Sequence, residues 1–184
     1  PYEVPDFDAI REEHYLPAYQ YAIKIHNEEI TAIINNPELS DFTNTIEALD
    51  RSGELIRTIE NVFGNLNSAH TNDLLQSIAK EKAPLISEHN DDITLNPILF
   101  ARIKEVYNKK ESLDLTAEQK MLLDKTYKEF VRGGANLGPE DQARLREINK
   151  ELSVLTLKFG ENVLKEINDF KLIIENEQDL SGLP

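Results

Sequence analysis

The sequence predicts an all-α protein, a bundle of about six helices. Three observations support this. Glycine and proline are sparse, at 7 and 8 of 184 residues, apolar residues recur at helical spacings of three and four, and helix-capping residues precede several of these stretches. Only Phe170–Ile174 (FKLII) has the composition of a strand. Because one strand cannot form a sheet alone, we expect its partner in sequence outside this chain.

The first helix is expected to start near Pro17 and to end at Asn35. Its apolar stripe repeats at spacings of three and four residues: Leu16, Tyr19, Ile23, His26, Ile30 and Ile33. Proline is tolerated in a first turn, where its missing N–H has no partner in the helix anyway. The Asn35-Asn36-Pro37 sequence then terminates the helix.

A second helix is expected to begin at Asn44, because Glu47 follows three residues later in a capping-box pattern. Its inner stripe consists of Ile46, Leu49, Ile56, Ile59, Phe63 and Leu66. Gly53 lies on that stripe, where a residue without a side chain lets a neighbouring helix approach closely. A glycine there costs about 1 kcal/mol of helix propensity relative to alanine.

Three further helices are marked by their ends. One is expected over Asn72 to His89, kinked at Pro84. The next begins at the Asn96-Pro97 pair, an N-cap followed by a first-turn proline, and continues through Leu99, Ile103 and Val106. The third begins at the Thr116/Gln119 capping box, runs to Val131, and is stopped by Gly133-Gly134.

The longest helix is expected from Pro139 to Asp169, opened by Gly138-Pro139. The stripe expected to face the protein interior is Leu145, Ile148, Leu152, Leu155, Phe159 and Val163. We find no repeat and no internal boundary, so residues 1–184 are expected to form one helical domain.

The composition excludes several classes of function. The net charge is −14, which disfavours binding to nucleic acid and to anionic membranes. There is no cysteine, so disulfides, thiolate metal sites and cysteine nucleophiles are excluded. No apolar run approaches the roughly 20 residues of a membrane span. The chain begins with Pro1 rather than methionine, so we expect the natural start to be missing, and the compartment stays open between cytoplasm and periplasm.

The four histidines do not have the spacing of a metal site. A zinc-binding helix needs two histidines at i and i+4, whereas these are His14, His26, His70 and His89. His26 is either a buried general base or, the interpretation we favour, a side chain packed at a helix interface with one ring nitrogen hydrogen-bonded. His70 is expected to belong to a group of capping residues between two helices: Ser68, Thr71, Asn72 and Asp73.

Other polar patterns also favour structural roles. The acidic pairs Glu12-Glu13, Glu28-Glu29 and Asp91-Asp92 point in different directions on a helix, so we expect solvated faces rather than acid–base dyads. Arg132-Gly133-Gly134 fits helix capping better than phosphate binding. The sequence therefore predicts no catalytic, no cofactor-binding and no metal-binding residue in this chain.

Several segments, in this order along the chain, carry a family resemblance: HYLPAY (14–19), FTNTIEALDRSGEL (42–55), NVFGNLNSAHTNDLL (61–75), LNPILFARIKEVY (95–107), FVRGGANLGPEDQARLREINKELSVLTLKFGENV (130–163) and DLSGLP (179–184). They resemble the N-terminal helical region of the thimet-oligopeptidase-like zinc metallopeptidases. Within that family the chain is most similar to the bacterial peptidyl-dipeptidases, also called dipeptidyl carboxypeptidases, and less so to oligopeptidase A.

The resemblance implies a longer parent enzyme with two helical lobes around a deep channel. Zinc and the catalytic Glu, carried by a His-Glu-x-x-His helix, belong to the other, C-terminal lobe, and no such motif occurs here. The implied parent cleaves short peptides near the C-terminus, and the partners of this lobe are those peptides and the missing catalytic lobe. The junction at His70 would then face the channel. Two alternatives stay open: the same lobe of an oligopeptidase A-like endopeptidase, or a free-standing helical binding module without catalysis.

Overall fold

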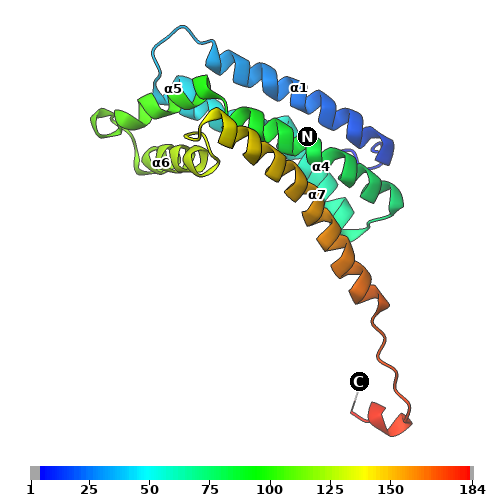
Figure 1. The fold of residues 1–184 in the computed structure, drawn as a ribbon. Coiled ribbons are helices and arrows are strands. Elements are labelled where there is room, and N and C mark those ends of the chain that lie inside the picture. The colour runs from blue at the N-terminus through cyan, green and yellow to red at the C-terminus, as the bar shows by residue number, and fades with distance from the viewer. Residues whose placement is uncertain (1–4, 183–184) are drawn as a thin grey trace.

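The protein is described here by a computed structural model that covers residues 5–182. These residues form helices joined by short loops, with no strand among them, which confirms the all-α fold class (Figure 1). Six helices have 12 or more residues, and their bounds, with the short α2, are α1 Tyr15–Ile34, α2 Ala48–Arg51, α3 Glu54–Ala69, α4 Asp73–Thr94, α5 Pro97–Asn108, α6 Ala117–Arg132 and α7 Pro139–Asp169. A π-helical segment, η2 (Phe42–Glu47), leads into α2. No helix within residues 5–182 is long and apolar enough to span a bilayer.

Two apolar clusters form the core. The first joins α1, α3 and α4 through Tyr15, Tyr19, Ala22, Ile56, Phe63, Leu75, Ile78 and Ala79. The second joins α5 and α6 with η2 and the C-terminal ends of α1 and α4, through Ile30, Ile33, Phe42, Ile46, Ile93, Leu99, Phe100, Ile103, Val106, Leu123 and Phe130. Figure 1 shows α4 at the centre, α5 and α6 gathered at one end, and α7 running along α4 and then projecting past it.

Three of the expected side-chain caps are formed. The side-chain oxygen of Asn72 accepts from the Leu75 N–H at 2.9 Å, and that of Asn96 accepts from the Ile98 and Leu99 N–H groups at 3.0 Å. The Thr116/Gln119 capping box is also present. One boundary differs, because α4 continues past Pro84 and His89 to Thr94. Its last turn is held in the core by buried Ile93.

The second helix was predicted wrongly in two respects. Its N-cap is Asp41, whose carboxylate accepts from the Asn44 N–H at 2.7 Å, so Asn44 is the third residue of the turn rather than its cap. The helix is also not continuous. It breaks at Ser52 and Gly53, and Gly53 adopts the left-handed conformation with φ of 69°. A residue without a Cβ accepts that conformation at little cost, which is why the chain bends there.

The bounds of α7 are as expected, but its apolar stripe does not face the interior. Leu145 is half-buried, and the rest of the predicted stripe is exposed: Ile148, Leu152, Leu155, Phe159 and Val163. The helix instead turns a mainly polar face toward α4, with Asn149, Ser153 and Glu161 half-buried beside Leu157. Within the described residues, α4 is the only element in extensive contact with α7. The apolar stripe therefore has no extensive partner among residues 5–182.

The strand expected at Phe170–Ile174 is not formed. Residues 170–176 have no regular secondary structure, and Phe170, Leu172 and Ile173 are exposed. A strand needs a neighbouring strand to receive its backbone hydrogen bonds, and no described segment lies in that position. Figure 1 shows this stretch leaving the end of α7 away from the bundle.

Candidate functional site

The structure brings together only two of the four histidines. His14 is exposed, and its Nδ1 accepts from the Arg11 N–H at 3.1 Å. His70 follows the end of α3, beside the Asn72 cap as expected, and lines a small cavity of about 220 Å³ with Phe7, Tyr15 and Leu75. Within residues 5–182 no group of three or more His, Asp or Glu side chains is placed to hold a metal ion.

His26 of α1 and His89 of α4 are in direct contact. His89 Nε2 lies 2.9 Å from His26 Nδ1, and His26 Nε2 lies 3.1 Å from Ser52 Oγ. This confirms His26 as a side chain packed at a helix interface, although both of its ring nitrogens are hydrogen-bonded. The pairing with His89 was not foreseen, because the two residues are 63 positions apart and belong to different helices.

The hydrogen bonds fix which nitrogen carries each proton. Ser52 Oγ lies 2.7 Å from the Leu49 carbonyl oxygen, to which it must donate. It therefore accepts from the Nε2–H of His26, whose bare Nδ1 in turn accepts from the Nε2–H of His89. Nδ1 of His89 is then an acceptor, and it is buried without a partner among the described residues. Both rings are neutral in this arrangement.

The surroundings favour those neutral rings. Burial lowers the pKa of His26, and proximity to His89 and to Arg57 lowers it further, while Glu29 opposes the shift. Burial also lowers the pKa of His89, against the weaker opposing effect of Asp92. A charged imidazolium is costly in a site withdrawn from water.

The histidine pair lies at the break between α2 and α3. The Gly53 N–H donates to Glu29 Oε2 of α1 at 2.7 Å, and Arg57 Nη1 donates to the Ser52 carbonyl at 2.6 Å. A Cβ added to Gly53 would lie 2.7 Å from Cε1 of His26. The close approach expected at this glycine is thus confirmed, and the partner is the His26 ring.

The Ser52–His26–His89 chain has the hydrogen-bond pattern of a nucleophile, a base and an orienting group. Ser52 is only 5% exposed and His89 only 3% exposed, so a peptide has no access to the hydroxyl. The Ser52 proton is also already committed to Leu49. The arrangement fastens three segments together and does not form an active site.

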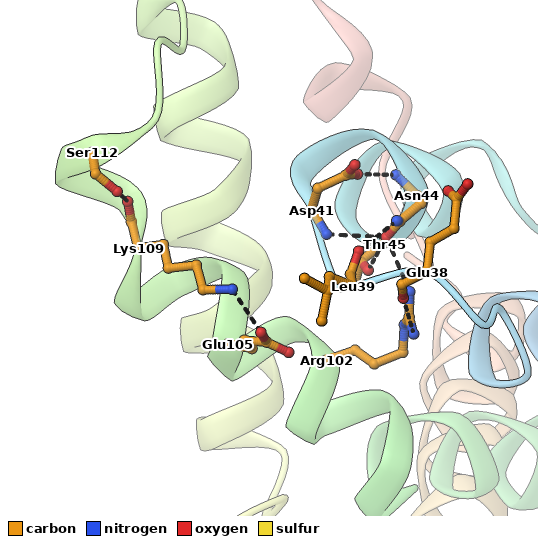
Figure 2. Close-up of polar contacts among 9 residues, drawn as sticks. All are labelled: Glu38, Leu39, Asp41, Asn44, Thr45, Arg102, Glu105, Lys109 and Ser112. Carbon is orange, nitrogen blue, oxygen red and sulfur yellow. Dashed lines mark hydrogen bonds and ion pairs between the residues drawn. The ribbon is translucent and has the colours of Figure 1, made fainter.

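Arg102 of α5 organises a second polar cluster, shown in Figure 2. Its Nη1 donates to the Asn36 and Glu38 carbonyls at 3.1 and 3.4 Å, and its Nη2 donates to Asn44 Oδ1 at 3.0 Å. The same Asn44 oxygen accepts from the Asp41 N–H and from the Thr45 hydroxyl. Two of the segments that carry the family resemblance, 42–55 and 95–107, therefore meet here through Asn44 and Arg102.

The contact between α4 and α7 is also polar. Asn149 Nδ2 donates to Asp91 Oδ1 at 2.7 Å, and Arg146 Nη1 pairs with Asp92 Oδ1 at 2.6 Å. The expectation that Asp91 lies on a solvated face is wrong, since its side chain is buried under α7 and burial raises its pKa. Beside it runs an open groove of about 490 Å³, lined by Lys82, Ile86, Asn90, Asn149, Leu152 and Thr156 among others.

The matches to known proteins extend over almost the whole chain. No family model matches it. It is 38% identical over 183 residues to the dipeptidyl carboxypeptidase of Escherichia coli K12, covering 100% of this chain and 27% of that protein. It is 28% identical over 181 residues to the oligopeptidase A of Haemophilus influenzae, covering 98% of this chain and 26% of that protein.

A third relative is matched over a similar length of this chain. The thimet-like oligopeptidase of Dictyostelium discoideum is 28% identical over 177 residues, covering 94% of this chain and 26% of the relative. The chain thus spans about a quarter of the length of the curated relatives it matches. The resemblance inferred from the sequence is confirmed: along its whole length, the chain is homologous to part of the dipeptidyl carboxypeptidases and, at lower identity, of the oligopeptidases A.

Proposed function

We propose that this chain is the N-terminal helical lobe of a zinc-dependent peptidyl-dipeptidase and forms part of the wall of its substrate channel. The observation that carries the proposal is the graded similarity. The identity is 38% to a dipeptidyl carboxypeptidase against 28% and 24% to two oligopeptidases A, with almost the whole chain aligned each time.

The described residues do not suit zinc themselves. Only two histidines converge, and their facing nitrogens are hydrogen-bonded to each other. In this family zinc polarises the scissile carbonyl and activates a water, so the residues that hold it belong to the remainder of the protein. The role proposed for this lobe is to exclude bulk water and to restrict which peptides enter.

The exposed stripe of α7 supports a permanent partner for this lobe. Its members Leu152, Leu155, Phe159 and Val163 lie on one exposed face of the helix, and an adjacent, mainly polar face is the one that contacts α4. An amphipathic helix normally buries its apolar face, and large contiguous apolar patches on a protein surface mark interaction sites. The relatives are nearly four times as long as this chain, so we propose that the rest of the same polypeptide covers the stripe.

The enzymatic proposal is tested on the full-length protein with one short peptide, supplied with a free and with an amidated C-terminus. We expect release of the C-terminal dipeptide from the free peptide only, because a peptidyl-dipeptidase requires that carboxylate as an anchor, and we expect a chelator to abolish the release. Equal cleavage of both peptides would favour the oligopeptidase A-like endopeptidase. Activity that persists in chelator would refute the zinc mechanism, and a full-length protein without any peptidase activity would favour the binding module.

The partner of α7 is tested by Phe159→Lys, with Asn168→Lys as the matched control on the opposite side of the same helix. In the 184-residue chain both substitutions should change the free energy of unfolding by less than about 0.5 kcal/mol, because both side chains are exposed. In the full-length protein Phe159→Lys should cost about 2 kcal/mol or more, since a buried phenylalanine contributes roughly 1.5–3 kcal/mol. Equal unfolding free energies of the two full-length variants, measured in urea, would show that nothing covers the stripe.

A further inference from the structure

The pair formed by His26 and His89 joins three parts of the fold. His26 belongs to α1, His89 belongs to α4, and Ser52 belongs to the break between α2 and α3. The ring of His26 also packs on Gly53, whose N–H is bound by Glu29 of α1. The position of the α2–α3 break relative to α1 and α4 therefore depends on one continuous chain of hydrogen bonds.

The hydrogen bonds from His89 through His26 to Ser52 can all form with only one arrangement of protons on the two rings. If His26 gains a proton on Nδ1, this new N–H meets the Nε2–H of His89 across 2.9 Å. His89 can accept the new bond only by moving its own proton to Nδ1, which is buried and has no acceptor among the described residues. When two protons are added to the neutral pair, His26 Nδ1 and His89 Nε2 both carry a hydrogen and face each other as donors. A buried donor without an acceptor costs more than a hydrogen bond ordinarily contributes, and the cost is higher for a charged donor.

Nearby charges do not compensate for this conflict. Glu29 of α1 favours a charged His26, but its Oε2 is already bound to the Gly53 N–H. Arg57 of α3 disfavours the same charge, and Asp92 of α4 weakly favours a charged His89 while it pairs with Arg146 of α7. The pKa of each histidine is lowered from its ordinary value of 6.5, chiefly by burial.

We propose that His26 and His89 form an acid-sensitive latch, which holds the α2–α3 break against α1 and α4 while both rings are neutral and releases it when the pair is protonated. Because the folded protein resists protonation more than the unfolded chain does, the unfolded state binds more protons as the pH falls below about 6.5. The stability that the latch supplies is therefore complete above that pH and is lost progressively below it. The Arg102 cluster contains no histidine, so its contacts between α5 and the segment 36–44 should be unchanged when the pH is lowered.

The first test is NMR of the 184-residue chain labelled at the histidine rings. At pH 7 both His26 and His89 should appear as neutral rings protonated at Nε2, and each should titrate below the ordinary histidine pKa of 6.5. In hydrogen exchange from pH 7.5 to pH 5.5, corrected for the intrinsic rate, the Ser52, Gly53 and Arg57 amides should lose protection at least tenfold, while the amide of Ile103 in α5 should not. Titration of both rings near 6.5, or unchanged protection at Gly53, would overturn the latch.

The second test separates the pair from every other titrating group. His89→Gln retains an N–H donor toward His26 but cannot take up a proton, and the exposed His70→Gln is the control. Between pH 7.5 and 5.5 the unfolding equilibrium constant of the control should rise with acid as in the parent chain, by up to roughly tenfold per pH unit for each histidine of the pair. His89→Gln should show a clearly smaller rise. The opposing contribution of Asp91, whose pKa is raised, is common to all three proteins and cancels in the comparison. An identical pH dependence in His89→Gln and His70→Gln would contradict the proposal.

Discussion

Replacement of Phe63 by alanine should lower the free energy of unfolding by about 3–5 kcal/mol, the usual cost of removing a buried aromatic side chain. Phe63 is 1% exposed and lies at the centre of the cluster formed by α1, α3 and α4. Its ring meets Tyr15 and Tyr19 edge-to-face, with centroids 5.1 and 5.9 Å away. The loss therefore includes both the transfer of the ring to water and the favourable contacts between aromatic edges and faces.

The Phe63 ring also faces a charge. The Lys82 ammonium lies 5.1 Å from its centroid and 2.7 Å from Glu60 Oε1. Removing the ring leaves this half-buried ion pair above a cavity, which adds to the cost. Because small domains are stable by only about 5–15 kcal/mol, Phe63→Ala should remove roughly a fifth or more of the total and shift the urea midpoint strongly.

A matched substitution tests whether burial is the cause. Phe159 is the same residue type, also on a helix, but it is 71% exposed. Phe159→Ala in the 184-residue chain should change the free energy of unfolding by less than about 0.5 kcal/mol. Similar losses for the two variants, measured by circular dichroism during urea unfolding, would mean that the α1–α3–α4 cluster is not the stabilising core.

Helix ends were the most predictable part of this fold, because their chemistry is local. Asn96 and the Thr116/Gln119 pair satisfy backbone donors two or three residues away, and such a relation is visible in the sequence itself. The Asn44/Glu47 pattern failed for the same local reason. Asp41 offers a competing cap three residues earlier, and its carboxylate takes the Asn44 N–H that a new helix start would have freed.

Which face of a helix packs against the rest of the protein was less predictable. The spacing of Leu152, Leu155 and Phe159 places them on one side of α7 but does not say what covers that side. An ion pair from Arg146 to Asp92 and a hydrogen bond from Asn149 to Asp91 instead hold a different, mainly polar face against α4. The spacing of apolar residues does not identify a partner that lies outside the described residues. For the same reason it does not identify what would pair with the segment 170–174.

The site depended on tertiary contacts that no local pattern encodes. His26 and His89 meet only because α1 and α4 pack side by side and because the chain bends at Gly53. The one local signal was a glycine on an apolar stripe, which indicated close approach but not the approaching ring. Family resemblance was more informative about function than the residues themselves, since the sequence assigned no catalytic role to any residue of the segments that carry it.

Gly53→Ala should lower the free energy of unfolding by about 2–4 kcal/mol, although it adds only a methyl group. A left-handed conformation costs a residue with a Cβ roughly 1–2 kcal/mol, and φ at Gly53 is 69°. The new methyl would also lie 2.7 Å from the His26 ring. The ring must then move, which weakens its hydrogen bonds to His89 and Ser52, each contributing about 1 kcal/mol.

Gly64→Ala is the control, because Gly64 lies in the interior of α3 and a Cβ there meets nothing within 4 Å. Alanine is the better helix former, so this variant should gain roughly 0.5–1 kcal/mol. The two glycine substitutions, 11 positions apart, should thus shift the urea midpoint in opposite directions. In a His26→Ala background the clash is absent, so Gly53→Ala should retain only the backbone cost of about 1–2 kcal/mol. If the cost of Gly53→Ala is the same in both backgrounds, the His26 ring does not press on Gly53, and the close packing of α1 against the α2–α3 break is refuted.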